Sequence, residues 1–193
     1  RSILTVERTV LNFLQRMSSI ATAVSLFTER ISHTKAKILD TRKTLPGFRS
    51  LDKYSVEKGG GINHRIGLYD MFLIKDNHIA AAGSVSKAIE ACLSYRIQKK
   101  IDYKVEVEVK NFDELNEALQ YNVDVIMFDN FSTDDMKKAV VIVNAKCKIE
   151  ASGMVNIDTV KEIAETGVDY ISVGAITHSV NALDISLEIT SSS

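Results

Sequence analysis

The alternation of short apolar runs with helical patterns is the feature that most limits how this chain can fold. Runs typical of buried strands cover residues 37–41, 72–75, 104–109, 125–129, 147–152 and 170–174. Helical patterns cover residues 84–97, 111–120, 132–143 and 157–165. Strands that alternate with helices at this spacing predict a parallel sheet. Six repeats favour a TIM-like parallel α/β barrel, incomplete or open, over a doubly wound sheet, which remains the alternative.

A long helix is expected before the repeats. Apolar residues recur at helical spacing from residue 5 to residue 30, which predicts one amphipathic helix. Asn111 and Ser132 each stand where a helix should begin, with Glu114 and Asp135 three positions later, as in N-cap signatures. We therefore expect one domain over residues 1–193, with a leading helix in residues 1–31 and the repeats in residues 36–180.

Composition excludes several classes of protein. The chain has 193 residues, 45% of them hydrophobic, and a net charge of -1, which suits one domain with a full core and speaks against a nucleic-acid partner. No apolar window is long enough for a membrane span, and no signal-peptide pattern opens the chain, so we expect a cytoplasmic protein without a membrane partner. Cys92 and Cys147 have neither disulfide nor metal-ligand spacing and are expected to be reduced core residues.

The segment from Thr41 to His78 concentrates groups that hold anions. It carries seven Lys and Arg against four Asp and Glu, although the whole chain is slightly acidic. Three consecutive glycines, Gly59 to Gly61, precede His64 and Arg65, and glycines allow backbone amides to approach an anion closely. The segment therefore predicts a focused anion site.

Polar residues also follow the predicted strands at one consistent place, the carboxyl end. In strand order they are Thr41, Arg42 and Lys43, then Lys75, Glu108, Asp129, Ser152 with Gly153, and Gly174. The carboxyl ends of parallel barrel strands form one rim, where the loops build the active site. We therefore expect these residues to converge. The short glycine turns after the last two strands suit a bound phosphate.

Structural interpretations stay open for single residues. Arg42 and Lys43 could be solvent-facing charges in a turn, and Lys75 could reach water along its apolar stem. Glu106 and Glu108 alternate with valines and so face one side, where one of them could belong to a buried ion network.

The same holds for the remaining polar positions. His64 and Arg65 could cap a loop, and Asp129 could be the N-cap of the next helix. His78 and His178 lack a metal-ligand partner at suitable spacing and are expected to be structural.

Together these groups define a chemistry: several cations, two separated carboxylates and a phosphate cradle, without a Ser/His/Asp or Cys/His nucleophile arrangement. Such a site suits transfer between two polyanionic substrates, with Mg²⁺ neutralising a diphosphate leaving group and carboxylates stabilising a developing cation.

Eight sequence strings, spread from end to end, resemble one family in the family's own order. They are ERTVLNFLQR at 7–16, DTRKT at 40–44, GGGINHRIGL at 59–68, LIKDNH at 73–78, EVEV at 106–109, FDNF at 128–131, EASG at 150–153 and GAITHS at 174–179. This set is similar to quinolinate phosphoribosyltransferase, also called carboxylating nicotinate-nucleotide pyrophosphorylase, in its C-terminal barrel domain. The resemblance implies that quinolinate and 5-phosphoribosyl 1-diphosphate give nicotinate mononucleotide, CO₂ and diphosphate, with Mg²⁺, in de novo NAD biosynthesis.

The resemblance also implies roles for individual residues. Quinolinate carboxylates would meet Thr41, Arg42, His64, Arg65 and Lys75, with Lys43 near both substrates. Ribose hydroxyls and Mg²⁺ would meet Glu108 and Asp129. The 5-phosphate would be held by Ser152, Gly153, Met154, Val173, Gly174 and Ala175. Four of these residues, Lys43, Lys75, Glu108 and Asp129, are the expected catalytic groups.

Two departures from the family pattern bear on these expectations. Met154 stands where relatives carry a second glycine, and the family's N-terminal α/β domain is not in this sequence. In the family that domain covers the partner subunit's barrel and adds an arginine, so the resemblance implies a homodimer or a higher even oligomer. This segment alone is expected to bind substrates weakly and turn over poorly.

Three rival functions remain. One is phosphoribosyl transfer to another pyridine or pyrrole carboxylate, and another is a lyase that uses Lys75 to form a Schiff base. The third is a non-catalytic domain that binds a phosphate ligand.

Overall fold

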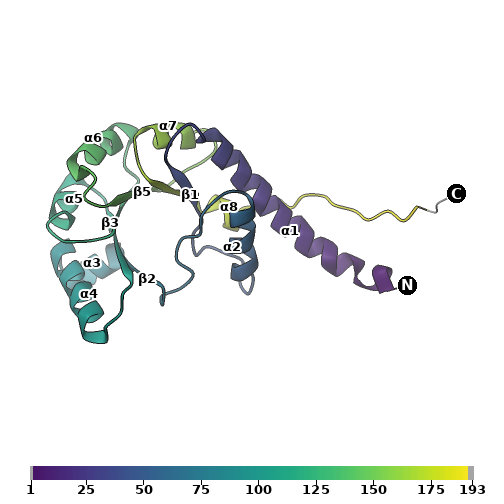
Figure 1. The fold of residues 1–193 in the computed structure, drawn as a ribbon, viewed down its shortest axis with the longest axis horizontal. Helices are drawn as coiled ribbons and strands as arrows, with labels where there is room; N and C mark the ends of the chain where they lie inside the picture. The colour runs from purple at the N-terminus through teal and green to yellow at the C-terminus, as the bar shows by residue number, and fades with distance from the viewer. Residues whose placement is uncertain (1, 191–193) are drawn as a thin grey trace.

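The fold is a curved parallel sheet of six strands with helices around its outside (Figure 1). The structure, a computed structural model, describes residues 2–190. The strands are β1 (Lys37–Leu39), β2 (Met71–Ile74), β3 (Lys104–Val109), β4 (Val125–Asp129), β5 (Lys148–Ser152) and β6 (Tyr170–Ser172). They lie in the order β1-β6-β5-β4-β3-β2, and all five pairings are parallel. The predicted parallel α/β architecture is confirmed, in its open form.

The barrel is open between its two edge strands, β1 and β2, and a loop occupies part of this seam. Ile62 forms an isolated parallel bridge with Leu39. Its N–H donates to the carbonyl of Ile38 at 2.8 Å, and its carbonyl accepts from the N–H of Asp40 at 3.3 Å. The chain therefore runs beside β1 immediately before it reaches His64.

Helices precede, connect and follow the strands, and α3 to α7 lie along the outside of the curved sheet (Figure 1). They are α1 (Ser2–Arg30), α2 (Arg49–Lys58), α3 (Asp76–Ala82), α4 (Val85–Lys99), α5 (Phe112–Ala118), α6 (Thr133–Val143), α7 (Val160–Glu165) and α8 (Ala175–His178). The Asn111 side chain accepts the N–H of Glu114, and Ser132 accepts that of Asp135, so both predicted N-caps are confirmed. Ser132 caps α6, hence Asp129 does not.

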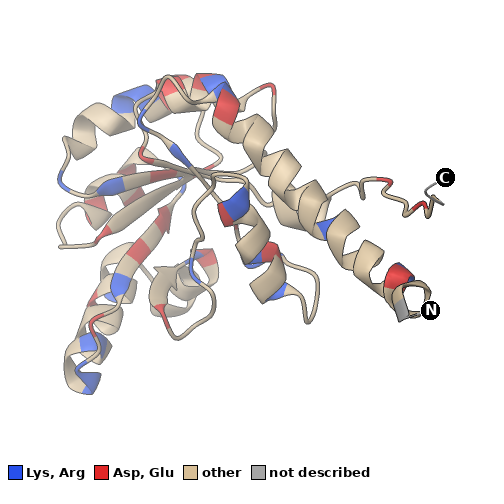
Figure 2. Ribbon diagram, turned by 45° about the vertical axis from the view of Figure 1, so that its right-hand side comes forward, with Lys and Arg blue, Asp and Glu red and all other residues tan. Residues whose placement is uncertain are grey.

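Helix α1 confirms the predicted leading helix. Its C-terminal half buries Ile20, Val24 and Phe27 in the core, and it packs against α2. Its N-terminal half extends away from the sheet and is mostly uncharged (Figure 2), with Leu4 62% exposed. One face of α1 thus completes the domain, whereas its first turns leave apolar side chains uncovered.

Side chains alternate between the two faces of the sheet, and this alternation separates the core from the site. In β3, Val105, Val107 and Val109 are fully buried in the helix-covered core. Between them Glu106 and Glu108 point to the concave face, where they are 1% and 7% exposed. The concave face of this open barrel therefore carries acidic and polar groups among its apolar side chains.

Three short helices, α2, α3 and α8, are absent from the predicted pattern. Both cysteines are free, as predicted, but they are partly buried and pack at the margin of the core. No helix within residues 2–190 is long and apolar enough to cross a membrane.

Candidate active site

A cavity of about 410 Å³ opens at the carboxyl ends of the strands and collects half of the predicted site residues. Its wall consists of Thr41, Arg42, Lys43, His64, Arg65, Leu68, Leu73, Lys75, His78, Met127, Glu150, Ser152 and Ser172. Residues from the loop after β1, the seam and the ends of β2 and β5 therefore meet, as the strand-end pattern predicts. Glu150 and Ser172 join them without having been predicted, although each lies two positions from a strand-end residue on the same strand face.

The other predicted residues lie outside the cavity wall. Glu108 does not border the cavity, but it pairs with Lys75, which does. The Lys75 Nζ is 2.5 Å from Glu108 Oε2. Asp129 ends β4 beside Asn130, which donates to its Oδ1 at 3.1 Å. Gly174 lies close to Lys43, since an added Cβ would be 3.4 Å from the Lys43 Cδ.

Three of the residues that we predicted to hold the 5-phosphate differ widely in solvent exposure. Val173 is 1% exposed, Ala175 is exposed at the start of α8, and Met154 is 92% exposed. A buried valine can offer a ligand its backbone at most, because its side chain belongs to the core.

The loop after β1 is held by hydrogen bonds that leave its cations free. The N–H of Lys43 donates to Thr41 Oγ1 at 3.0 Å, and Thr177 Oγ1 donates to the Lys43 carbonyl at 2.8 Å. Both bonds use the backbone of Lys43. The ammonium group of Lys43 and the guanidinium group of Arg42 consequently remain available at the mouth of the cavity.

Arg42 and Arg65 lie close enough to influence each other's charge, and Glu106 and Asp70 act on Arg65 from a longer range. Burial and the charge of Arg42 both lower the pKa of the Arg65 guanidinium. Within residues 2–190 neither arginine forms an ion pair, and Arg65 Nε is buried without a hydrogen-bond partner. Two neighbouring cations, one half-buried, raise the free energy of the empty site, and a bound anion would lower it.

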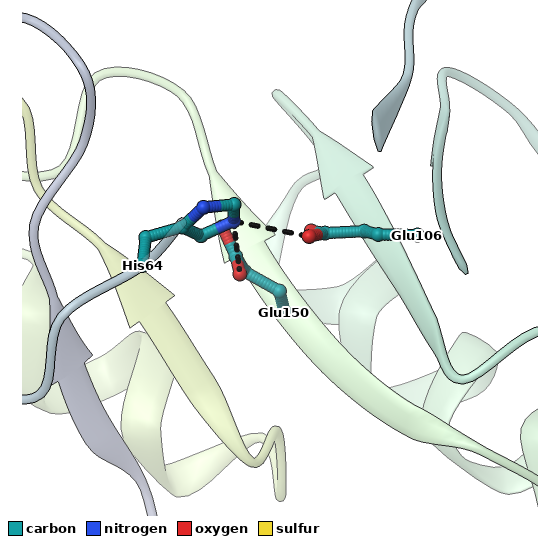
Figure 3. Close-up of side chains that lie close together, drawn as sticks. All are labelled: His64, Glu106 and Glu150. Carbon is teal, nitrogen blue, oxygen red and sulfur yellow. Dashed lines mark ion pairs between the residues drawn. The ribbon is translucent and has the colours of Figure 1, made fainter. Parts of the chain in front are cut away.

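Beneath the cavity, His64 faces two buried glutamates (Figure 3). Its Nε2 is 3.0 Å from Glu106 Oε2 and 3.5 Å from Glu150 Oε2. Burial lowers the pKa of His64, but the two carboxylates outweigh burial and raise the pKa to about 10. Burial, followed by the charge of Glu150, raises the pKa of Glu106 to about 7. Of the two glutamates on this face of β3, Glu106 is therefore the one that belongs to a buried ion network, as the sequence left open.

The geometry of His64 also decides whether this cluster suits a metal. The three side chains could place one ligand atom each within 4.8 Å of one another. However, the N–H of Arg65 donates to His64 Nδ1 at 2.8 Å, so Nδ1 carries no proton in this structure and the ring is the tautomer with its proton on Nε2, facing the glutamates. The two carboxylates favour a second ring proton, whereas the Arg65 amide opposes one on Nδ1. A metal bound to Nε2 would move that proton to Nδ1, against the Arg65 amide. The cluster is built to hold a proton between carboxylates.

Gly153, in the loop that we predict to hold phosphate, is a position that only glycine fits. Its φ is +98°, and a Cβ there would lie 2.1 Å from Asn130 Oδ1 and 2.9 Å from the Asn130 backbone nitrogen. The next residue, Met154, also has a left-handed φ of +49°, which glycine adopts without steric cost. The second glycine that the family resemblance leads us to expect at position 154 would suit this backbone.

We expect Gly153→Ala to lower the free energy of unfolding by about 3 kcal/mol, from left-handed strain plus overpacking. The control is Gly47→Ala, because Gly47 has φ +79° with no atom within 4 Å of the added Cβ. Urea unfolding of this control should show a loss of about 1 kcal/mol, from strain alone. Equal losses in the two variants would contradict the predicted clash with Asn130.

A second, larger cavity of about 560 Å³ lies at the opposite ends of the strands. Lys35 and Lys148 border it, but both pair with Asp169, at 3.1 and 3.0 Å. Two of its three lysines are thus paired, and none of the residues predicted at the carboxyl ends of the strands borders it. The smaller cavity is therefore the candidate active site.

Comparison with known proteins matches most of this chain to one family. Residues 20–188 match the family described as "Quinolinate phosphoribosyl transferase, C-terminal domain". The chain is 49% identical to "Quinolinate phosphoribosyltransferase [decarboxylating] 1b" of Nicotiana tabacum, over 97% of this chain and 57% of that protein. It is 46% identical to "Probable nicotinate-nucleotide pyrophosphorylase [carboxylating]" of Bacillus subtilis, over 98% of this chain and 64% of that protein.

A solved structure is similar as well. The nicotinate-nucleotide pyrophosphorylase from Francisella tularensis superposes with a TM-score of 0.90 at 50% identity, covering 95% of this chain and 64% of that one. The chain therefore spans somewhat more than half the length of the relatives named here.

Proposed function

The chain belongs to the quinolinate phosphoribosyltransferase family, and we propose that it carries the barrel site in which quinolinate reacts with 5-phosphoribosyl 1-diphosphate. The products would be nicotinate mononucleotide, CO₂ and diphosphate. The observation that carries this proposal is the pair of neighbouring arginines, Arg42 and Arg65, which have no carboxylate partner among the described residues and border a cavity of about 410 Å³.

The quinolinate half of the site would be the cationic wall. Arg42, Arg65 and Lys75 can each donate to a carboxylate from a different side of the cavity. In the structure both ring nitrogens of His64 are occupied. A direct hydrogen bond from His64 to quinolinate would therefore require its ring to leave Glu106 and Glu150. Thr41 and Lys43 complete this half, with Lys43 directed toward the second substrate.

The phosphoribosyl half would lie at the ends of β3 to β6. The carboxylates of Glu108 and Asp129 can accept from the ribose hydroxyls, and their charge would stabilise the cationic ribosyl centre as diphosphate departs. The loops at Ser152 to Met154 and Val173 to Ala175 would hold the 5-phosphate. Lys75 joins the two halves, because it borders the cavity and pairs with Glu108.

Mg²⁺ fits this arrangement as an ion shared with the substrate. Glu108 and Asp129 end adjacent strands and offer oxygen ligands, the type that Mg²⁺ prefers. Two carboxylates do not fill six positions, so diphosphate oxygens and water would supply the rest. When bound, the ion would neutralise charge on the leaving diphosphate.

A homodimer is the proposed assembly, with the partner subunit's N-terminal domain over the cavity. Its support is the apolar surface on the first turns of α1, where Ile3, Leu4, Val6, Val10 and Leu14 are each at least 46% exposed. The cytoplasmic location stays a prediction.

Turnover by the full-length protein tests the proposed function. With Mg²⁺ and both substrates, one nicotinate mononucleotide and one CO₂ should form per diphosphate released. Nicotinate and a pyrrole dicarboxylate serve as alternative acceptors, and preference for either would overturn the assignment of quinolinate. Borohydride should trap no adduct on Lys75, because its Nζ is bound to Glu108 Oε2 and is not free to attack a carbonyl.

A further inference from the structure

Helix α2 buries two adjacent charged residues, although charged side chains are seldom buried in proteins. Asp52 is 0% exposed and Lys53 is 3% exposed. Neither lines the cavity. They do not pair with each other; each is bound to a different part of the chain. A buried ion pair is often no more stable than an apolar pair of the same size, so stability alone does not explain their presence.

Asp52 fastens the loop after β1. Its Oδ1 accepts from Arg16 Nε at 2.8 Å, and its Oδ2 accepts from Arg16 Nη2 at 2.6 Å and from the N–H of Leu45 at 3.1 Å. Arg16 Nη2 also donates to the carbonyl of Thr177, whose hydroxyl binds the Lys43 carbonyl. Helices α1, α2 and α8 thereby fix both ends of residues 43–45.

Lys53 fastens the segment that bears His64 and Arg65. Its Nζ donates to Asp40 Oδ1 at 2.6 Å and to the carbonyl of His64 at 2.9 Å. Asp40 Oδ1 also accepts the N–H of His64, at 2.8 Å. The peptide groups on both sides of the His64 Cα are therefore tied to one buried ion pair.

We propose that Asp52 and Lys53 are positioning residues that set the distance between the loop cations Arg42 and Lys43 and the seam cation Arg65. One turn of α2 binds both parts of the cationic wall, the loop after β1 and the segment with His64 and Arg65, so α2 fixes the spacing between them. This inference rests on the proposed function for its ligand, a compact dicarboxylate whose two charges must reach both the loop cations and Arg65.

Hydrogen–deuterium exchange tests the positioning without reference to turnover. In the full-length protein, Asp52→Asn should speed amide exchange at least tenfold in residues 41–45 and leave residues 63–66 within threefold. Lys53→Met should speed amide exchange at least tenfold in residues 63–66 and leave residues 41–45 within threefold. The control is Val143→Ala, which replaces a buried residue of α6 away from both segments and should also lower thermal stability. It should leave exchange in both segments within threefold.

Kinetics supply the second readout. Both α2 variants should raise KM for quinolinate about tenfold or more, with KM for 5-phosphoribosyl 1-diphosphate within threefold, and Asp52→Glu should recover part of the loss. Val143→Ala should change neither KM. Equal exchange changes in both segments, or KM changes matched by the control, would overturn the proposal. A wild-type protein without phosphoribosyl transfer would instead overturn the proposed function, and the exchange pattern would still decide the positioning.

Discussion

Replacing Arg65 with alanine is expected to lower kcat/KM for quinolinate by about 100-fold, while KM for 5-phosphoribosyl 1-diphosphate changes less than about threefold. Arg65 is half-buried, close to Arg42, and its Nε has no partner among the described residues. A charge-assisted hydrogen bond to a carboxylate contributes about 1.5–3 kcal/mol, and about 1.4 kcal/mol corresponds to tenfold. The loss should therefore fall on the dicarboxylate substrate.

Steady-state kinetics with each substrate varied in turn will measure this effect. Arg96→Ala is the matched control, because Arg96 lies in α4 and makes a 3.9 Å contact with Asp124, which does not border this cavity. It should leave both KM values unchanged. Equal losses for the two substrates in Arg65→Ala would show that Arg65 does not distinguish the halves of the site.

The second large effect concerns stability. Asp40→Leu should lower the free energy of unfolding by about 3–5 kcal/mol, because it leaves the ammonium group of Lys53 buried without its counter-charge. Burial raises the pKa of the Asp40 carboxyl even though Lys53 lies 2.6 Å away, which shows how much each charge depends on the other. Urea unfolding followed by circular dichroism will measure the loss.

A double-mutant cycle separates the pair from its surroundings. Asp40→Leu combined with Lys53→Met should be less destabilised than the sum of the two single changes, since the double variant buries no lone charge. Lys137→Ala removes an exposed ion pair with Asp134 and should change stability by less than about 0.5 kcal/mol. Additive losses at Asp40 and Lys53 would contradict the coupling.

Sequence patterns predicted the elements whose apolar residues face one core. Both ends of β3 and β4 agree with prediction, because these strands are buried and bounded by turns. Helix α2 was missed for a physical reason. It directs Asp52 and Lys53 inward with Val56, so its buried face includes charges and gives no apolar stripe. A pattern based on hydrophobicity cannot recognise a helix that buries ion pairs.

The site was predictable to the extent that topology fixes it. Strand ends must meet at one rim, so the cavity gathered Arg42 and Lys75 as expected, and Arg65 joins them from the seam loop in the predicted anion-holding segment. Which charges pair with one another was not predictable. Glu106 on β3 and Glu150 on β5 are separated by β4 in the sheet, and they meet at His64 because the sheet curves. Curvature depends on packing throughout the domain, and no local spacing reports it.

The seam between β1 and β2 has a mechanical consequence. Elsewhere neighbouring strands are joined by rows of backbone hydrogen bonds, whereas β1 meets the seam loop through a single bridge at Ile62. Resistance to opening there comes mainly from side chains, and side-chain contacts can be exchanged one at a time. The cationic wall lies on this side of the barrel, so the region that would admit and release the proposed charged ligand is also where the fewest backbone hydrogen bonds would have to break.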